Sequence, residues 1–184
     1  VLMTLLLPLG VMLALRRRGG TWTAFLTGAG TFVLFAMVLE PILHNLILRS
    51  PAGAAIQQNI LLYALYGGLA AGLFEETGRL LAFRFILKPH TARITALSYG
   101  IGHGGIEAFW VMGLSMIANL SLGLAYTSGA PLPAEAAAAA ETILSTPAGM
   151  FLWGGLERLS AMALHMALPV LVFASVRTGR RLLF

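Results

Sequence analysis

The sequence predicts an all-α fold, a bundle of transmembrane helices in a single domain over residues 1–184. Of its residues, 58% are hydrophobic and only 10% are charged, whereas soluble domains carry about 25% charged residues. Several apolar runs also exceed the roughly 20 residues that a helix needs to cross a bilayer. We therefore expect an integral membrane protein that lies within lipid.

Five segments are predicted to span the membrane, at residues 1–15, 22–48, 57–87, 94–125 and 148–176. The first has its arginines after the apolar run, the reverse of a secretory signal peptide, so we interpret it as a transmembrane helix. Because it is short and the chain starts with valine, we expect the sequence to be a piece of a longer protein. Between the last two spans, AEAAAAAETIL predicts a short surface helix, with a substrate-gating element as the alternative.

The basic residues predict the orientation, because cytoplasmic loops of membrane proteins are rich in lysine and arginine. The predicted cytoplasmic clusters are Arg16, Arg17 and Arg18; Arg84, Lys88 and Arg93; and Arg177, Arg180 and Arg181. The N-terminus is then outside and the C-terminus cytoplasmic. These loops explain the net charge of +5 without a nucleic-acid partner. The absence of cysteine excludes disulfides and thiolate metal sites.

Ionisable residues inside the spans are the strongest functional signal. A charge at the bilayer centre costs at least about 2.5–3.5 kcal/mol, so such groups usually serve a function. Five of the seven acids and three of the four histidines lie in the spans. They occur as Glu75 and Glu76, His103 and Glu107, Glu157 and His165, and Glu40 and His44. Carboxylates and imidazoles together can activate water, which suggests hydrolysis inside the membrane.

The depth of these residues predicts one shared site. At about 1.5 Å per residue from the flanking cytoplasmic charges, Glu76 and His165 lie roughly 18 Å deep and His103 about 15 Å deep. Three helices thus bring carboxylates or imidazoles to one level. By the same count, Glu157 and the Glu40–His44 pair lie nearer the outer surface, where we interpret the pair as interfacial.

Two short motifs suggest specific roles. In Glu75-Glu76-x-x-Arg79, the arginine lies one helical turn from both acids and is expected to neutralise one of them, which leaves the other as a general base. In His103-Gly-Gly-Ile-Glu107, imidazole and carboxylate share a helix face among glycines that leave room for a substrate or a neighbouring helix. The structural alternatives are a buried ion pair and a packing histidine. Glu157-Arg158 is either a structural charge pair or a support for the site.

Together these segments resemble the YhfC-type family of predicted bacterial intramembrane proteases, a group related to the CAAX prenyl-protease/Abi and PrsW families. The resemblance covers roughly residues 60–175, the expected catalytic core. It rests on Glu-Glu-x-x-Arg at 75–79, GHGGIEA at 102–108, and Glu157-Arg158 with His165. It implies a location in the bacterial cytoplasmic (inner) membrane.

The related CAAX proteases suggest how the site works. In them, a glutamate of the double-glutamate motif and the histidine of an aromatic-x-x-x-His motif activate water. Tyr99-x-x-x-His103 matches the second motif here. A later His-x-x-x-Asn supplies oxyanion contacts in those relatives, whereas in this chain His165 is followed by Pro169 at the asparagine position.

The leading hypothesis is an intramembrane endopeptidase that cleaves membrane-embedded or membrane-associated proteins or peptides. The expected catalytic roles are a general base at Glu75, or at Glu76 if the helix phase differs, a water-orienting His103 and an oxyanion donor at His165. The supporting residues are Arg79, which holds the remaining glutamate, together with Tyr99, Glu107, Glu157 and Arg158.

Three questions stay open at this point. The CAAX relatives favour metal-free glutamate chemistry without a cofactor, and a zinc ion held by His103, Glu107, His165 and one of the two adjacent glutamates is the alternative. A proton-coupled transporter or channel would also need buried ionisable residues. The second alternative is a catalytically idle membrane scaffold or maturation factor. The sequence indicates neither the substrate nor the oligomeric state.

Overall fold

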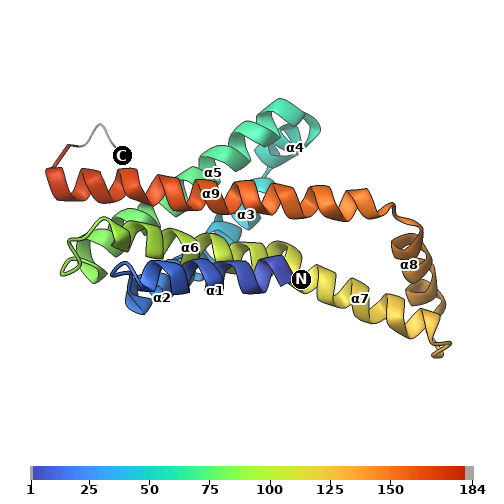
Figure 1. Ribbon diagram of the computed structural model, residues 1–184. Helices are drawn as coiled ribbons and strands as arrows, with labels where there is room; N and C mark the ends of the chain where they lie inside the picture. The colour runs from blue at the N-terminus through green and yellow to red at the C-terminus, as the bar shows by residue number, and fades with distance from the viewer. Residues whose placement is uncertain (1, 181–184) are drawn as a thin grey trace.

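The computed structural model describes residues 2–180, and within this range the chain forms helices joined by loops, with no strand (Figure 1). The elements are α1 (Leu2–Arg16), α2 (Trp22–Phe32), the π-helical turn η1 (Val33–Leu39), α3 (Glu40–Leu48), α4 (Pro51–Gln58), α5 (Ile60–Leu81), the π-helical turn η2 (Ala82–Ile86), α6 (Ile94–Ala108), the π-helical turn η3 (Phe109–Gly113), α7 (Leu114–Thr127), α8 (Ala134–Ser145) and α9 (Ala148–Thr178). The predicted all-α fold is confirmed, and α8 is the predicted short helix.

Among the described residues, three continuous helical stretches are long and apolar enough to cross a membrane: Trp22–Leu48, Ile94–Thr127 and Ala148–Thr178. They correspond to the second, fourth and fifth predicted spans. Helix α1 is apolar but has 15 residues, fewer than the roughly 20 of a full span. Helix α5 carries three charged residues near its C-terminal end. The number of spans and the orientation therefore stay predictions.

The predicted span at 57–87 is present as the continuous helical stretch of α5 and η2, residues 60–86, and its first two residues belong to α4 instead. Helix α4 ends at Gln58, and α5 begins after Asn59, whose side chain accepts hydrogen bonds from the first turn of α5. Helix α4 was not predicted, although Ser50-Pro51 is a typical helix start. The Ser50 hydroxyl accepts a hydrogen bond from Gly53 N–H, and proline at the first helical position needs no N–H partner.

Helix α6 is the centre of the bundle and packs against α1, α2 and α9 (Figure 1). Its glycines permit this close packing. A Cβ atom on Gly102 would lie 1.9 Å from the carbonyl oxygen of Phe25 in α2, and one on Gly100 would lie 2.3 Å from the carbonyl oxygen of His165 in α9. Pro169 has no N–H to bond that same carbonyl, four residues earlier. The glycines thus bring α2 and α9 onto α6 beside His103.

One end of the bundle holds two of the predicted cytoplasmic segments. The guanidinium of Arg177, in the last turn of α9, donates hydrogen bonds to the carbonyl oxygens of Leu87, Lys88 and His90 in the loop before α6. This contact ties the end of α9 to the loop between α5 and α6. The arrangement agrees with the predicted orientation, in which both segments face the cytoplasm.

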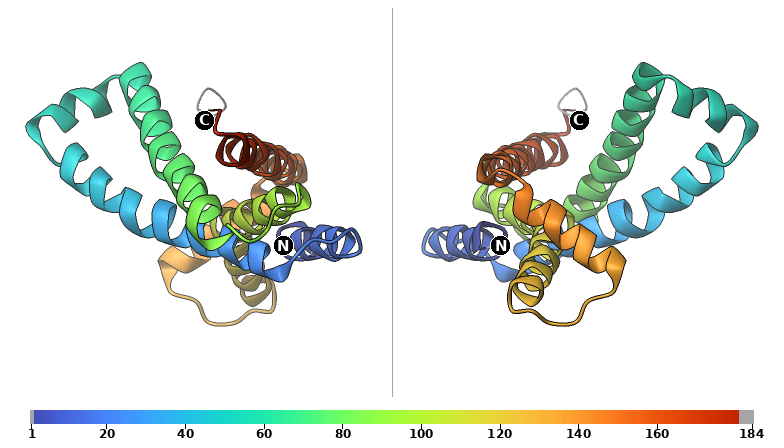
Figure 2. Two further views of the ribbon diagram at one scale, coloured as in Figure 1. Left: turned by 90° about the vertical axis from the view of Figure 1, so that its left-hand side faces the viewer. Right: turned by 90° about the vertical axis from the view of Figure 1, so that its right-hand side faces the viewer.

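Helices α3, α4 and α5 form an arm that leans away from α6 and α9 (Figure 2). The imidazole of His44 connects its two long sides: Nδ1 lies 2.8 Å from the hydroxyl of Tyr66 in α5, and Nε2 lies 3.1 Å from Glu40 Oε1. The predicted Glu40–His44 pair is therefore present. The contact with Tyr66 could not be predicted from the sequence, because only the tertiary structure brings α5 beside α3.

We expect Gly28→Ala to loosen the contact between α2 and α6. A Cβ atom there would lie 2.0 Å from the carbonyl oxygen of Tyr99, and backbone atoms cannot move aside cheaply. Overpacking of this kind costs about 1–3 kcal/mol, so thermal unfolding in detergent should occur at lower temperature. Gly10→Ala in α1 is the control, because the described chain places no atom within 4 Å of its Cβ position. Equal stability of the two variants would contradict the packing argument.

Candidate functional site

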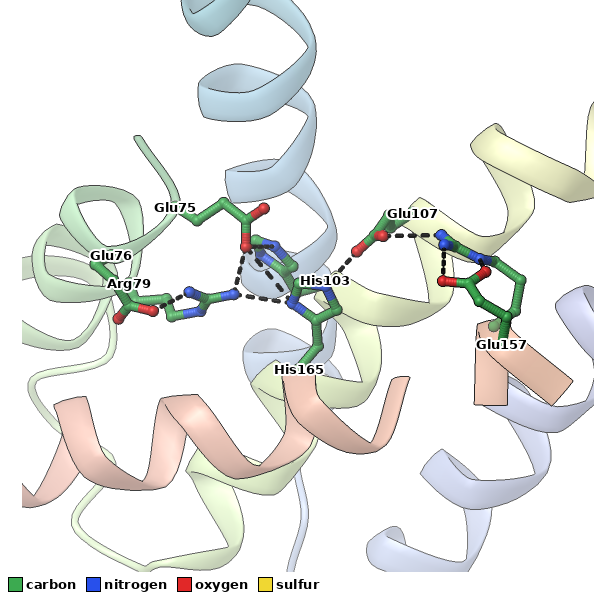
Figure 3. A network of polar contacts seen from close by, with 8 residues as sticks. Glu75, Glu76, Arg79, His103, Glu107, Glu157 and His165 are labelled. Carbon is green, nitrogen blue, oxygen red and sulfur yellow. Dashed lines mark hydrogen bonds and ion pairs between the residues drawn. The ribbon is translucent and has the colours of Figure 1, made fainter. Parts of the chain in front are cut away.

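Glu75, His103 and His165 come together from α5, α6 and α9 (Figure 3). Each residue can offer one ligand atom to a metal ion, and these three atoms lie within 4.8 Å of one another. Glu75 Oε2 is 3.4 Å from His103 Nε2 and 3.6 Å from His165 Nδ1, and the two imidazole centroids are 4.9 Å apart. The predicted convergence of these three segments is present in the structure.

The side chains of the cluster are buried on the side of α6 and most exposed on the side of α5. His103 is fully buried, and the side chains of His165, Glu75 and Glu76 are 9%, 17% and 30% exposed. The His103 ring packs edge-on against Phe32, with centroids 5.2 Å apart. Exposure of the cluster therefore rises toward α5.

Tyr99 contributes to the packing of His103. Its ring is fully buried, and its centroid lies 6.0 Å from that of His103 and 4.9 Å from that of Phe83. The tyrosine of the aromatic-x-x-x-His motif therefore packs against the imidazole.

Arg79 contacts both acids of its motif, although its single positive charge balances only one of them. Its Nη2 donates to Glu75 Oε2 at 2.6 Å, and its Nη1 donates to Glu76 Oε1. The spacings of three and four residues place the two carboxylates on either arm of the guanidinium, which carries five N–H donors. Nη2 also lies 2.9 Å from His165 Nδ1.

The contacts of His165 define which of its nitrogens carries the proton. Arginine acts only as a donor, so Nδ1 accepts from Arg79 and Nε2 carries the hydrogen. Nε2 contacts the carboxylate of Glu107, which accepts that hydrogen. Because both nitrogens are engaged, the geometry does not support the predicted role of His165 as an oxyanion donor.

Glu107 is in turn held from α9. Arg158 Nη1 donates to Glu107 Oε1 at 3.0 Å, and two other nitrogens of Arg158 contact the carboxylate of Glu157 (Figure 3). Glu157-Arg158 is therefore both a charge pair and a support for the site. Sequence reasoning missed the contact between Arg158 and Glu107, because 51 residues separate them and no local pattern connects them.

Three of the predicted zinc ligands, Glu75, His103 and His165, form a group that could hold a metal ion. Glu107 is not in this group, because it lies one turn beyond His103 and reaches the far nitrogen of His165. Four-coordinate zinc has bonds of about 2.0–2.1 Å, which places its ligand atoms roughly 3.3–3.4 Å apart. The observed separations of 3.4 and 3.6 Å fit this geometry.

Two further observations fit a divalent metal ion. Within residues 2–180, Nδ1 of the buried His103 has no hydrogen-bond partner, and its Nε2 has Glu75 Oε2 as its polar contact at 3.4 Å; a buried nitrogen without a partner is costly. The network also contains more negative than positive charge. Its four carboxylates face two guanidiniums, so two negative charges remain when the histidines are neutral. Glu157 is 58% exposed, so the excess among the other three carboxylates and the two guanidiniums is one negative charge. Buried charges are normally paired or bound to metals.

Comparison with protein families adds an independent finding. The sequence model of the YhfC intramembrane metalloprotease family matches residues 3–184. The description of this family as metalloproteases does not support the expected metal-free chemistry and leans toward a metal. The comparisons do not bear on the resemblance to the CAAX and PrsW families.

A relative of known sequence agrees with this match. The chain is 36% identical over 192 residues to the membrane protein YhfC of Bacillus subtilis (strain 168), which is itself described as uncharacterized. The aligned region covers 96% of this chain and 72% of that relative. No solved structure matches the chain. The resemblance predicted from the motifs is confirmed, and the chain is an integral membrane protein that belongs to the YhfC family of intramembrane metalloproteases.

Proposed function

We propose that this protein is a metal-dependent intramembrane endopeptidase in which Glu75, His103 and His165 hold a zinc ion. The observation that carries the proposal is the group of three ligand atoms that three helices supply, all within 4.8 Å of one another. A bound zinc ion would supply a polarised carbonyl and an activated water at neutral pH. The substrates are membrane-embedded or membrane-associated polypeptides of the bacterial cytoplasmic membrane.

Glu76 is the general base in this proposal. It is the neighbour of the ligand Glu75, and it is the most exposed residue of the cluster, with 30% of its side chain accessible. Arg79 holds one of its oxygens, which orients the carboxylate. A carboxylate in this place can accept the proton of the attacking water and pass it to the leaving amine.

His103 and His165 are each held in position by neighbouring side chains. The rings of Phe32 and Tyr99 pack against His103, and Glu107 accepts the Nε2 hydrogen of His165. A histidine that binds a metal usually donates its other ring N–H to a carboxylate or carbonyl, which fixes its tautomer. Glu107 does so here and leaves Nδ1 as the ligand atom.

The substrate approaches along α5. Leu69, Leu73 and Glu76 follow one another at spacings of four and three residues, so they lie on one helix face. Both leucines are exposed. An apolar polypeptide segment in the bilayer can therefore lie along this face and present its backbone to Glu76.

Proteolysis by the purified protein in liposomes tests the proposal. We expect it to cleave transmembrane peptides, to lose this activity to a zinc chelator and to regain it with added zinc. Proton-driven solute flux without cleavage of any membrane peptide would contradict the proposal and favour a transporter. Cleavage that survives complete removal of metal would instead favour glutamate chemistry.

We expect Glu107→Ala to weaken zinc binding by about 10–100-fold, the usual cost of losing the partner of a metal-bound histidine. Glu107→Gln keeps a side-chain oxygen that can accept the His165 hydrogen, so it should retain most of the affinity. Glu141→Ala is the control, because this carboxylate binds Tyr126 away from the site. Zinc titration of the three variants checks the prediction, and wild-type affinity in Glu107→Ala would contradict it.

A further inference from the structure

Arg79 contacts two of the three proposed ligand atoms. Its Nη2 lies 2.6 Å from Glu75 Oε2 and 2.9 Å from His165 Nδ1. The imidazole nitrogen Nδ1 has a single lone pair, which can accept a hydrogen bond or bind a metal ion but cannot do both. Arg79 and a metal ion are therefore alternative partners of His165.

We propose that Arg79 competes with the metal ion for Glu75 and His165, and that Glu76 retains the guanidinium when the metal binds. This inference rests on the ligand set of the proposed function. On metal binding, the hydrogen bond from Arg79 Nη2 to His165 breaks. The carboxylate of Glu75 then binds the metal ion in place of the Arg79 guanidinium. The contact between Arg79 Nη1 and Glu76 Oε1 remains.

The surroundings of Arg79 suit such an exchange. The guanidinium is 1% exposed, and within residues 2–180 its Nε has no hydrogen-bond partner. Its terminal nitrogens thus provide its hydrogen bonds, all to Glu75, Glu76 and His165. An arginine cannot lose its charge in a protein, so it needs a carboxylate in both states. The exchange explains why two adjacent glutamates precede Arg79: one changes partner and the other holds the arginine.

Zinc affinity measured against a chromophoric chelator tests the competition, on the purified full chain in detergent. We expect Arg79→Met to bind zinc roughly 10–100-fold more tightly than the wild type, because the ligand atoms no longer give up charge-assisted hydrogen bonds. Arg79→Lys should fall between the two, since a single ammonium cannot match the guanidinium fork. If Arg79→Met does not fold, tighter binding by Arg79→Lys supports the inference and wild-type affinity overturns it.

Arg158→Met is the matched control for charge. It also removes one positive charge from the network, but Arg158 contacts Glu107 and Glu157 and none of the three ligand atoms. Competition predicts no gain in affinity for this variant. An equal gain in Arg158→Met and Arg79→Met would overturn the inference, because a general effect of charge would then explain both.

The role of Glu76 is tested by a double-mutant cycle with Arg79. Glu76→Gln should weaken zinc binding several-fold, because Arg79 loses its charged partner Glu76 and then binds Glu75 and His165 more strongly. In the Arg79→Met background the same change should have no effect. An equal loss in both backgrounds would contradict retention of the arginine by Glu76.

Failure of the inference can be told apart from failure of the proposed function. If wild-type zinc binding requires His103 but Arg79→Met binds no more tightly, the competition is wrong and the ligand set stands. If zinc binding does not depend on His103, the ligand set is wrong, and the inference fails with it.

Discussion

His103→Asn is expected to abolish proteolysis and leave the helical bundle folded. His103 is fully buried and supplies one of the three proposed ligand atoms. The shorter asparagine cannot bring an atom to the same place, so zinc binding and activity should be lost together. Removal of a general base lowers the rate by about 10²–10⁴-fold. The loss of activity in His103→Asn should be at least as large.

His44→Asn is the control for this result. It is the same substitution in a membrane helix, at a histidine that binds Glu40 and Tyr66 outside the metal group. We expect the His44 variant to keep its zinc and its activity. Full activity of His103→Asn toward a transmembrane peptide would show that the reaction takes place elsewhere.

The second large effect separates the two adjacent glutamates. Both Glu75→Gln and Glu76→Gln keep the size of the side chain and remove its charge. We expect Glu75→Gln to lose zinc and activity together, because Glu75 lies between the two histidines. Glu76→Gln should still bind zinc at saturating concentration and yet lose about 10²–10⁴-fold in kcat, as expected for a general base.

Metal analysis and single-turnover cleavage of the same preparations measure both quantities. The opposite pattern, with zinc lost in Glu76→Gln and retained in Glu75→Gln, would reverse the two assignments. Full activity in both variants would contradict an active site at this cluster.

The sequence predicts the helices and the depth of the site because both depend on local properties. Apolar length defines the stretches Trp22–Leu48, Ile94–Thr127 and Ala148–Thr178. The rise per residue of a helix then converts distance along the chain into depth. This count predicts that Glu76, His103 and His165 lie at one level.

Contacts between helices could not be predicted in this way. Arg79 reaches His165 across 86 residues, and which face of α9 meets α5 depends on how the helices pack. The same limit applies to the carboxylates around the two histidines. The four-residue spacing of His103 and Glu107 predicts a shared face, but it does not tell that Glu75 enters between the histidines and that Glu107 binds the far side of His165.

Helix α4 was missed for a different reason. Most of it lies between the predicted spans 22–48 and 57–87, where hydropathy gives no signal, whereas the start of α4 at Ser50-Pro51 and the cap of α5 at Asn59 depend on individual side chains. Such capping residues can be recognised in the sequence.

The metal content and coordination of the purified, active protein test the central claim most directly. Elemental analysis with zinc X-ray absorption should find one zinc ion per chain, bound by two imidazoles and one carboxylate at about 2.0–2.2 Å. The His103→Asn variant should lose this signal. Fully active protein that contains far less than one metal ion per chain and keeps cleaving after chelation would contradict the claim.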